Sequence, residues 1–308
     1  MNRPSLDVWH TASRLVLLAA LLAVGGHAMS AEWESVGPFG GDQFDVRIAP
    51  GDPDTLYALS VHGLHRSRDG GDRWSAIDTR DMFIGFTGFN IDPRDILHLH
   101  TGTFQSGIWQ SRDGGDQWSD CSEGLPTREE TPELYYPVVS LAQSADGRLF
   151  AGLSTEGGLS DPPAWIYSSQ SGCNDWVGAD SGIQPADITL SQPAQTLLTT
   201  DPLGRLWAMS YGAGVYRYDA GQWLDATGNL PEAGARGTFL AHDPGNAERL
   251  LLATEDQWVF ETIDSGASWA PLELPESLRD LSDLPLAYMI AIDPNNDRTV
   301  FVPVSYTH

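Results

Sequence analysis

The octet "SRDGGDRW" at Ser67–Trp74 decides how this chain folds, because copies of it recur along the sequence. A near-identical copy, "SRDGGDQW", spans Ser111–Trp118, and a third, "TIDSGASW", spans Thr262–Trp269. Degenerate copies are "SSQSGCNDW" at 168–176 and "YRYDAGQW" at 216–223. The five closing tryptophans are spaced by 44, 58, 47 and 46 residues, which is the period of a four-stranded propeller blade.

The segments between the octets predict strands. Upstream of each copy lie two apolar segments joined by a turn, as in "FDVRIAPGDPDTLYALS" at 44–60 and "TFLAHDPGNAERLLLATE" at 238–255. The turns contain Asp-Pro, Asp-Gly or Pro-Gly, which supply the fixed or positive φ that a β-turn needs. A third short strand leads into each octet, and a fourth follows its tryptophan. We therefore expect an all-β chain of four-stranded antiparallel blades.

The octet itself has a structural explanation. The carboxylate of Asp69 can accept backbone N–H bonds across the turn, Gly71 tolerates positive φ, and Trp74 can fold back against the blade. Burying about 150 to 250 Å² of indole at about 25 cal/mol per Å² stabilises the fold by up to about 4 to 6 kcal/mol before entropy costs. We expect a turn rather than a catalytic device, since the copy at 168–176 carries Gln170 where the others carry aspartate.

These residues resemble the Asp-box, or BNR, repeat. The positions that carry the resemblance are Ser67, Asp69, Gly71, Trp74, Ser111, Asp113, Gly115, Trp118, Thr262, Asp264, Gly266 and Trp269. Families that share the repeat include sialidases, sortilin-type receptors, tandem-propeller xyloglucanases and photosystem II assembly factors. The resemblance implies a single β-propeller with the boxes on turns remote from the functional face. It identifies architecture more strongly than function.

The sequence resembles some of these families more than others. The repeat at 91–126 is similar to those of xyloglucanases and sortilins. A sialidase would carry an Arg-Ile-Pro signature near its start, whereas "VRIAP" at 46–50 inserts Ala49 and is explained as the first strand of the repeat. Tandem xyloglucanases need two propellers, and residues 31–308 supply one.

The sequence predicts six blades, five from the octets and a sixth shared by the two ends of the chain. The segment "AYMIAIDPNNDRTVFVPVS" at 287–305 matches the first two strands of a blade and stops before a third strand or octet. The segment "EWESVG" at 32–37 resembles the strand that follows an octet, so we expect it to complete the last blade. A missing third strand would leave unpaired sheet edges, which predicts that the sequence is C-terminally incomplete.

The first thirty residues are predicted to be a secretory signal peptide. Arg3 and Arg14 precede the apolar run "LVLLAALLAV" at 15–24, and small residues follow. This run is too short to span a bilayer, and no later segment reaches about eighteen apolar residues. We expect residues 31–308 to form one exported propeller domain, periplasmic or extracellular, without a transmembrane segment.

The charge limits the partners. The chain has 17 basic and 42 acidic residues, a formal net charge of −25. Such a surface repels nucleic acid and anionic lipid. We expect a glycan or protein partner, a monomeric chain and no cofactor.

Candidate functional residues lie on loops that should face away from the octets, because antiparallel strands place alternate connections at opposite ends. Three such loops stand out, at 127–137, 154–165 and 253–257. The ligand-binding candidates are Tyr135, Tyr136, Trp165, Glu133, Glu255 and Asp256. The candidate catalytic carboxylates are Glu129, Glu130, Glu156 and Asp161.

Carboxylates on the same loops as aromatic side chains suit sugar binding or glycoside hydrolysis, which needs two acids across the substrate. A solvated acidic rim explains the same residues without a ligand. His98 and His100 alternate on one strand and so share a sheet face, where they could bind zinc. No clustered cysteine or short His-x-x-x-His set accompanies them, so ordinary packing explains them better and we expect no metal.

The two cysteines, Cys121 and Cys173, lie three residues from the octet tryptophans of adjacent blades. Export permits a disulfide. The outer strands of neighbouring blades diverge, however, and a bridge needs Cα atoms within about 7 Å. The sequence leaves the pairing open.

The function predicted from these features is a binding or scaffold module for a glycan, a peptide or a partner protein. One alternative is a glycosidase of the sialidase or xyloglucanase type that uses carboxylates in the central funnel. The other is an assembly factor for a membrane complex. Two carboxylates facing each other across the funnel would favour the enzyme, and an aromatic, acid-poor funnel would favour binding.

Overall fold

The structure is a computed structural model that describes residues 43–60, 63–79, 82, 88–129, 131–155, 161–183, 195–231, 236–254, 259–272 and 290–301. These residues form strands and turns, with no helix among them. The predicted signal peptide at 1–30 and the strand expected at 32–37 lie outside the described residues.

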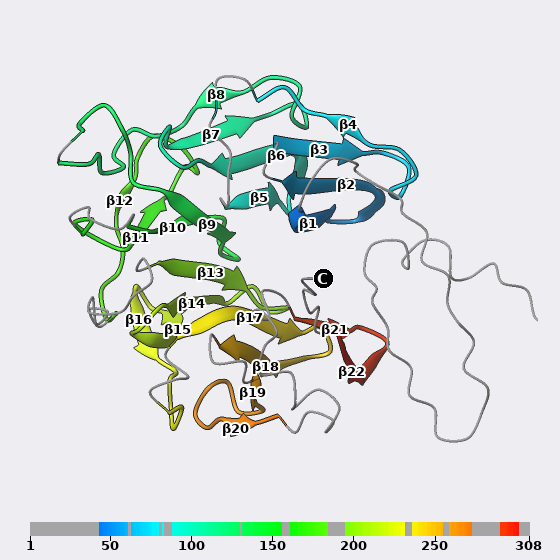
Figure 1. The fold of residues 1–308 in the computed structure, drawn as a ribbon, viewed down its shortest axis with the longest axis vertical. Helices are drawn as coiled ribbons and strands as arrows, with labels where there is room; N and C mark the ends of the chain where they lie inside the picture. Colours follow the sequence, from blue (N-terminus) through cyan, green and yellow to red (C-terminus); the bar gives the residue numbers. More distant parts are fainter. Residues whose placement is uncertain are drawn as a thin grey trace, which may run out of the picture. The chain divides into compact units, whose positions relative to one another are not determined.

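The described strands form five four-stranded antiparallel sheets, each in chain order, and one two-stranded sheet (Figure 1). The first sheet contains β1 (Gln43–Ala49), β2 (Asp52–Ser60), β3 (Gly63–Ser67) and β4 (Ser75–Ala76). The second contains β5 (Phe89–Asp92), β6 (Asp95–Gly102), β7 (Ile108–Ser111) and β8 (Ser119–Asp120). The third contains β9 (Val138–Gln143), β10 (Leu149–Leu153), β11 (Ile166–Ser169) and β12 (Val177–Gly178). The fourth contains β13 (Thr196–Thr200), β14 (Leu206–Ser210), β15 (Gly214–Asp219) and β16 (Gln222–Asp225). The fifth contains β17 (Gly237–Asp243), β18 (Asn246–Thr254), β19 (Val259–Thr262) and β20 (Ala270–Pro271). The two-stranded sheet contains β21 (Ala291–Asp293) and β22 (Asn296–Phe301).

Five predicted blades are therefore confirmed as four-stranded sheets. Of the predicted sixth blade, the described residues show the pair of β21 and β22. The described residues divide into two compact units: unit 1 contains 43–60, 63–79, 82, 91–99 and 111–118, and unit 2 contains the other described residues. The second sheet contributes residues to both units.

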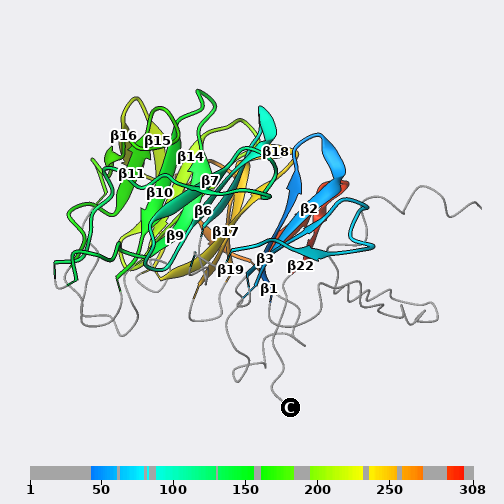
Figure 2. The same cartoon turned by 90° about the horizontal axis from the view of Figure 1, so that it is seen from above.

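Successive sheets of unit 2 pack through their inner strands. Strand β9 packs against β13, β14 against β17, and β17 against β21. Strands β9, β14 and β17, one from each of three successive sheets, are labelled in Figure 2. The core lies in layers between the sheets: Phe150 meets the indole of Trp223 edge-on, with 6.2 Å between ring centroids, and Trp207 clusters with Leu252 of the next sheet. Strands β10 and β14 are buried along their whole length because a sheet covers each face. This layering explains why both strands are apolar at nearly every position.

Asp-Pro turns close several of the hairpins that the sequence predicts. Asp243 Oδ1 accepts hydrogen bonds from the backbone N–H of Gly245 (2.8 Å) and of Asn246 (3.2 Å). The carboxylates that cap their own turns in the same way are those of Asp92, Asp201 and Asp293. Such a carboxylate mimics one side of a backbone turn, so it fixes the hairpin locally.

A polar cluster in unit 2 surrounds Trp207. The buried carboxylate of Asp201 accepts hydrogen bonds from Trp207 Nε1 (3.1 Å) and Arg205 Nε (2.6 Å). Burial opposes the ionisation of Asp201, but these bonds outweigh it and hold its pKa below the ordinary value. The ring of His242 lies 6.0 Å from that of Trp207, and its buried nitrogens have no hydrogen-bond partner in the described part of the chain. Burial lowers the pKa of His242 to about 4, with Asp201 opposing the fall and Arg205 adding to it.

The free energy of unfolding should fall as the pH drops from 6.5 to about 4. An unfolded histidine takes up a proton near pH 6.5, whereas folded His242 does so only near pH 4, so the unfolded state binds more protons in this window. The difference corresponds to up to about 3 kcal/mol. His242→Phe keeps the ring contact and removes the ionisable group, so it should flatten this part of the curve. Denaturant unfolding between pH 4 and 7 measures both proteins, and parallel curves would contradict the assignment.

The octets lie between the third and fourth strands. In the first copy, Ser67 Oγ accepts the N–H of Gly71 (2.9 Å) and Asp69 Oδ1 accepts the N–H of Arg73 (2.8 Å). In the copies at 111–118 and 262–269, the equivalent hydroxyl oxygens accept the same bond: Ser111 Oγ from Gly115 N (2.8 Å) and Thr262 Oγ1 from Gly266 N (2.9 Å). The glycine has φ of +94°, +101° and +84° in the three copies, a region in which a side chain is strained.

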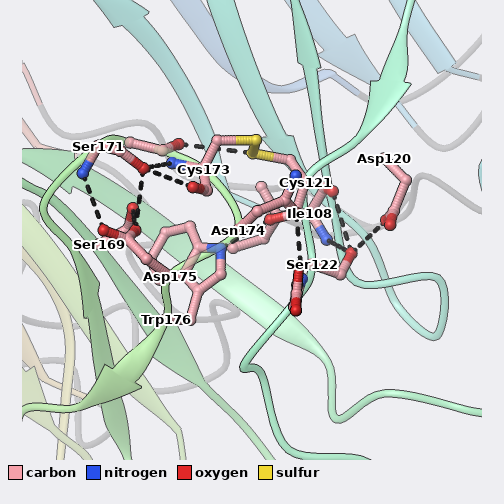
Figure 3. Close-up of a disulfide and its surroundings, with 12 residues drawn as sticks. Ile108, Asp120, Cys121, Ser122, Ser169, Ser171, Cys173, Asn174, Asp175 and Trp176 are labelled. Atoms are coloured by element: carbon pink, nitrogen blue, oxygen red, sulfur yellow. Dashed lines mark hydrogen bonds between the residues drawn. A yellow bond between two sulfur atoms is a disulfide. The ribbon is translucent and has the colours of Figure 1, made fainter.

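The copy at 168–176 keeps the turn with different residues (Figure 3). Strand β11 ends at Ser169, as β3 ends at Ser67, so Ser171 and not Gln170 occupies the aspartate position. The assignment of Gln170 to that position from the sequence was therefore wrong by one residue. Asp175, from the other side of the turn, supplies the carboxylate and accepts the N–H of Ser171 (3.2 Å) and the hydroxyl of Ser169.

The copy at 216–223 is a two-residue hairpin instead. Strand β15 pairs directly with β16, and Asp219 faces Gln222 across the turn. Ala220 and Gly221 have φ of +47° and +92°, the pair of positive values that a type I′ turn requires. An Ala-Gly pair therefore replaces the longer polar turn of the other copies.

The structure joins Cys121 and Cys173 in a disulfide, with 5.0 Å between their Cα atoms (Figure 3). Cys121 follows β8, and Cys173 lies in the turn between β11 and β12. The divergence expected of outer strands does not separate them, because the turn of the third sheet lies against the segment that leaves the second. Glu123 N donates to Asn174 Oδ1 (3.2 Å) within the same contact.

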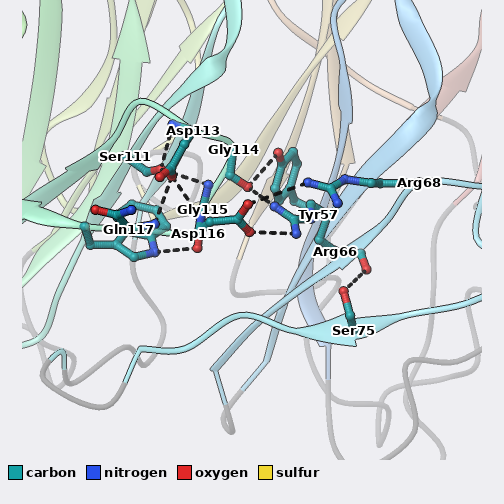
Figure 4. A network of polar contacts seen from close by, with 11 residues as sticks. Tyr57, Arg66, Arg68, Ser75, Ser111, Asp113, Gly114, Gly115, Asp116 and Gln117 are labelled. Atoms are coloured by element: carbon teal, nitrogen blue, oxygen red, sulfur yellow. Dashed lines mark hydrogen bonds and ion pairs between the residues drawn. The ribbon is translucent and has the colours of Figure 1, made fainter.

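In unit 1, the second octet is held by side chains of β2 and β3 (Figure 4). The carbonyl oxygen of Gly114 accepts hydrogen bonds from the Tyr57 hydroxyl (3.2 Å) and from Arg66 Nη1 (2.6 Å). Arg66 Nη2 also pairs with Asp116 Oδ1 at 2.9 Å. Burial raises the pKa of Tyr57, with Arg66 and Arg68 opposing it, so the phenol stays protonated and donates at neutral pH.

The octet tryptophans fall into two groups. Trp176, Trp223 and Trp269 are buried, and their indole N–H groups donate to the carbonyls that follow the fourth strand of the preceding sheet, those of Cys121 (2.7 Å), Ala179 (2.7 Å) and Ala226 (2.9 Å). Trp74 and Trp118 are half-buried and donate to their own turns, at Gly71 and Gly115, both at 3.1 Å. The tryptophan therefore links neighbouring blades in one group and only closes a turn in the other.

Trp269→Ala should destabilise the protein more than Trp74→Ala. Removing Trp269 empties a buried site and leaves the Ala226 carbonyl without its donor, so we expect a loss of about 3 to 5 kcal/mol. Trp74 is half-buried, and we expect a loss of about 1 to 2 kcal/mol. Chemical denaturation of the two variants tests this order, and a larger loss for Trp74→Ala would contradict it.

Candidate ligand-binding loops

The candidate residues lie at one end of the strands. Successive strands of a sheet are antiparallel, so the second-to-third connections and the connections between sheets share the end opposite the octets. In unit 2 this end includes the connections 103–107, 121–137 and 154–165, of which 130 and 156–160 lie outside the described residues. We refer to this end as the loop end.

Arg128 holds two of these connections together. Its side chain is only 4% exposed. Nε donates to the carbonyl oxygen of Tyr135 (2.9 Å), Nη2 donates to that of Phe104 (3.2 Å), and the guanidinium lies 6.0 Å from the Phe104 ring. Tyr135 N in turn donates to Gln105 O at 2.9 Å. The arginine therefore orders the loop that carries Tyr135 against the connection between β6 and β7.

The side chain of Tyr135 is half-buried and packs over Gly107. A Cβ atom on Gly107 would lie 3.1 Å from Tyr135 Cδ2 and 2.2 Å from Ser122 Oγ, so only glycine allows this approach. Burial raises the pKa of Tyr135, and the nearby charge of Asp120 adds to the effect. Tyr135 thus presents a neutral phenol at the loop end.

Tyr136, the neighbouring candidate, belongs to the core. It is 1% exposed and packs in the cluster that includes Ile108, and its hydroxyl donates to the carbonyl oxygen of Asp161 (3.4 Å). It therefore connects the loops at 121–137 and 154–165 and does not present a surface to a ligand in this conformation. Trp165 is half-buried, and its backbone N–H donates to Asp180 Oδ2 at 2.9 Å.

The acidic candidates are divided between two connections. Glu129 and Glu133 are exposed on the first, and Asp161 is exposed on the second. Glu130, Glu156, Glu255 and Asp256 lie outside the described residues. The described loop end thus combines half-buried aromatic rings with exposed carboxylates.

The histidine pair lies on β6. His98 is 8% and His100 is 1% exposed, and His98 Nδ1 is 3.8 Å from Asp92 Oδ2. Across the described ranges, no group of three or more His, Cys, Asp and Glu side chains could hold a metal ion. Nor do the described residues include a helix long and apolar enough to cross a membrane.

Three residues of the loop end were not singled out from the sequence: Arg128, Phe104 and Trp109. Trp109 is half-buried, and its indole donates to Ser106 O at 3.0 Å. The segment 103–109, "TFQSGIW", places two aromatic residues beside the glycine that begins a third strand, and Arg128 is the one basic residue in 127–137. Both patterns could have indicated these positions.

No protein-family model matches this chain, and no curated protein matches its sequence. Its structure is similar to a GH74 enzyme from Niastella koreensis, with a TM-score of 0.66 and 19% identity over 85% of this chain and 44% of that one. The GH74 xyloglucanase from Xanthomonas campestris gives a TM-score of 0.62 and 19% identity over 84% and 43%. The extracellular domain of a putative hybrid two-component system from B. thetaiotaomicron gives 0.57 and 16% over 88% and 33%.

This chain therefore spans less than half the length of these solved structures. At such identities the likeness establishes the fold. Together with the five four-stranded antiparallel sheets, it defines the chain as a β-propeller protein.

The adjacent tyrosines should respond differently to substitution. Tyr136→Ala removes a buried ring and its hydrogen bond, so it should lower the free energy of unfolding by about 3 to 5 kcal/mol. Tyr135→Ala removes a half-buried ring and should cost about 1 kcal/mol. Thermal and denaturant unfolding compare the pair, and equal losses would show that Tyr135 is as much a core residue as its neighbour.

Proposed function

We propose that this chain is an exported β-propeller that binds a glycan, a peptide or a partner protein at the loop end. The observation that carries the proposal is the set of contacts that order the two loops bearing the half-buried side chains of Tyr135 and Trp165. Buried Arg128 fixes the backbone carbonyls of Phe104 and Tyr135, and buried Tyr136 joins that loop to the one bearing Trp165. Preorganised aromatic side chains give binding surface at low entropic cost.

The chemistry of this surface suits a polyhydroxylated or a basic ligand. Aromatic rings stack on the apolar faces of sugars or on cations, and exposed carboxylates accept hydrogen bonds from hydroxyl or ammonium groups. Glu129, Glu133 and Asp161 supply such carboxylates.

A glycoside hydrolase is the second candidate. The supporting observation is that exposed Glu129 and Asp161 belong to the two loops that the Tyr136 hydrogen bond joins. Glycoside hydrolysis uses two carboxyl groups, one on each side of the scissile bond. A role as an assembly factor for a membrane complex is a form of the protein-binding proposal and would use the same surface.

A glycan and peptide array, run beside a hydrolysis screen on residues 31–308, separates these candidates. Binding without turnover supports the binding module. Turnover that is lost in Glu129→Gln or Asp161→Asn supports the hydrolase.

The position of the binding surface is tested by Tyr135→Ala and Trp165→Ala. Each should weaken binding by about tenfold, the loss expected when one aromatic contact worth about 1 to 2 kcal/mol is removed. The control is Ile263→Ala, because Ile263 is 67% exposed on an octet turn at the opposite end. Binding that is lost in the control and kept in the two loop variants would contradict the proposed site.

A further inference from the structure

We propose that the Cys121–Cys173 disulfide is a redox-operated clasp that holds the 121–137 connection in the conformation that presents Tyr135. This inference rests on the proposed function, because it concerns the regulation of the same loop. Both cysteines, the contacts around them and the loop itself belong to unit 2.

The clasp lies at the root of the loop. Cys121 N donates to Ile108 O (2.9 Å), which fixes the last residue before the connection leaves the second sheet. On the other side, Trp176 donates twice to the same short segment, from Nε1 to Cys121 O (2.7 Å) and from N to Glu123 O (3.2 Å). The disulfide is the covalent member of this set, so it brings the turn at 169–176 and the loop root together.

A short chain of contacts leads from the clasp to Tyr135. Ser122, next to Cys121, accepts the N–H of Ile108 at Oγ (3.0 Å) and lies against Gly107. Tyr135 packs over the same glycine. A displacement of Cys121 therefore moves Ser122, which forms one wall of the site where Tyr135 rests.

The copy of the octet at 168–176 is built differently from the others at the cysteine. Cys173 occupies the position that Gly71 holds in the first copy, where φ is +94°. Gly172 keeps the positive φ of Gly70 (+80° against +67°), and the second positive φ falls on Asn174 (+58°) in place of Cys173. A left-handed asparagine is less strained than most residues but more strained than glycine. The turn is therefore held by Asp175, by the hydrogen bonds that Trp176 and Asn174 make to the loop root, and by the disulfide, and reduction removes the one covalent constraint in this set.

The two cysteine residues differ in exposure. Cys121 is fully buried, whereas Cys173 is half-buried between exposed Ser171 and Asn174. The thiolate of a dithiol reductant can therefore attack Cys173 Sγ, breaking the bond to Cys121, which leaves as a thiolate and takes up a proton. The second thiol of the reductant then attacks the mixed disulfide. It releases Cys173 as a thiol and leaves the reductant as a cyclic disulfide, so two electrons pass from the dithiol to the protein.

The test compares the oxidised protein with the Cys121→Ser/Cys173→Ser variant by hydrogen exchange and by acetylation with N-acetylimidazole. We expect exchange in 122–135 to rise by at least about tenfold, as for a segment that opens locally, while exchange in β13 and β14 is unchanged. Acetylation of Tyr135, measured by mass spectrometry, should become faster. Neither measurement needs a ligand, so the clasp can fail or succeed independently of the proposed function.

Two results would overturn the clasp. One is unchanged exchange and acetylation at the loop, which would leave the disulfide as a simple crosslink. The other is an equal rise throughout unit 2, which would mean general destabilisation. Where the double variant does not fold, the wild-type protein reduced with dithiothreitol and alkylated replaces it under the same criteria. The redox step has its own check: glutathione should form a mixed disulfide at Cys173, and a mixed disulfide at Cys121 would contradict the proposed order of attack.

Discussion

The hydrogen bond from a buried indole to the end of the preceding blade is the interaction on which unit 2 depends. A carbonyl just beyond the last ladder bond of a sheet needs a donor, and the bonds of Trp176, Trp223 and Trp269 supply one at three successive junctions. The same side chains fill the apolar layers between the sheets. Tryptophan thus donates a hydrogen bond to a backbone carbonyl and also packs the core where one blade meets the next.

These junctions also explain a second set of glycines. Each segment that follows a fourth strand passes so close to the next tryptophan turn that a Cβ atom would overlap a backbone oxygen. The glycines at these approaches are Gly124, Gly182 and Gly228, at 2.3 Å from Trp176 O, 2.2 Å from Trp223 O and 2.8 Å from both Gly266 O and Ala267 O. The repeat is therefore longer than the octet: it includes a glycine five or six residues after the tryptophan, which the sequence shows at "EGLP", "SGIQP" and "TGNLP".

Most of the blade architecture could be predicted from the sequence, because hairpins and tight turns are local. Asp243 with Pro244 and Gly245 specifies its turn without help from distant residues. The errors arose where a distant contact decides. Once the end of β11 is known, Ser171 and not Gln170 corresponds to the aspartate of the other octets. The carboxylate that holds this turn comes instead from Asp175, on the other side of the turn. The disulfide depended on how two blades approach, which no spacing of cysteines reveals.

The candidate site was predicted less completely for the same reason. Tyr135 and Tyr136 are adjacent and chemically alike, and only the packing against Ile108 and Asp161 sends one inward. Arg128 could be recognised as unusual in an acidic loop, but its role depends on the carbonyl groups of Phe104, more than twenty residues earlier in the chain, and of Tyr135, seven residues later. Buried side chains that order a loop are thus harder to predict from the sequence than exposed side chains on its surface.

The Ala220–Gly221 turn has a consequence for how this chain can be altered. Its two residues are exposed, their hairpin is specified by the backbone of β15 and β16, and a Cβ on Gly221 would meet nothing within 4 Å. A turn of this kind is where new chain ends or an inserted segment disturb a fold least. The propeller could be circularly permuted there, or could carry a second domain, with Trp223 still in place one residue into the next strand.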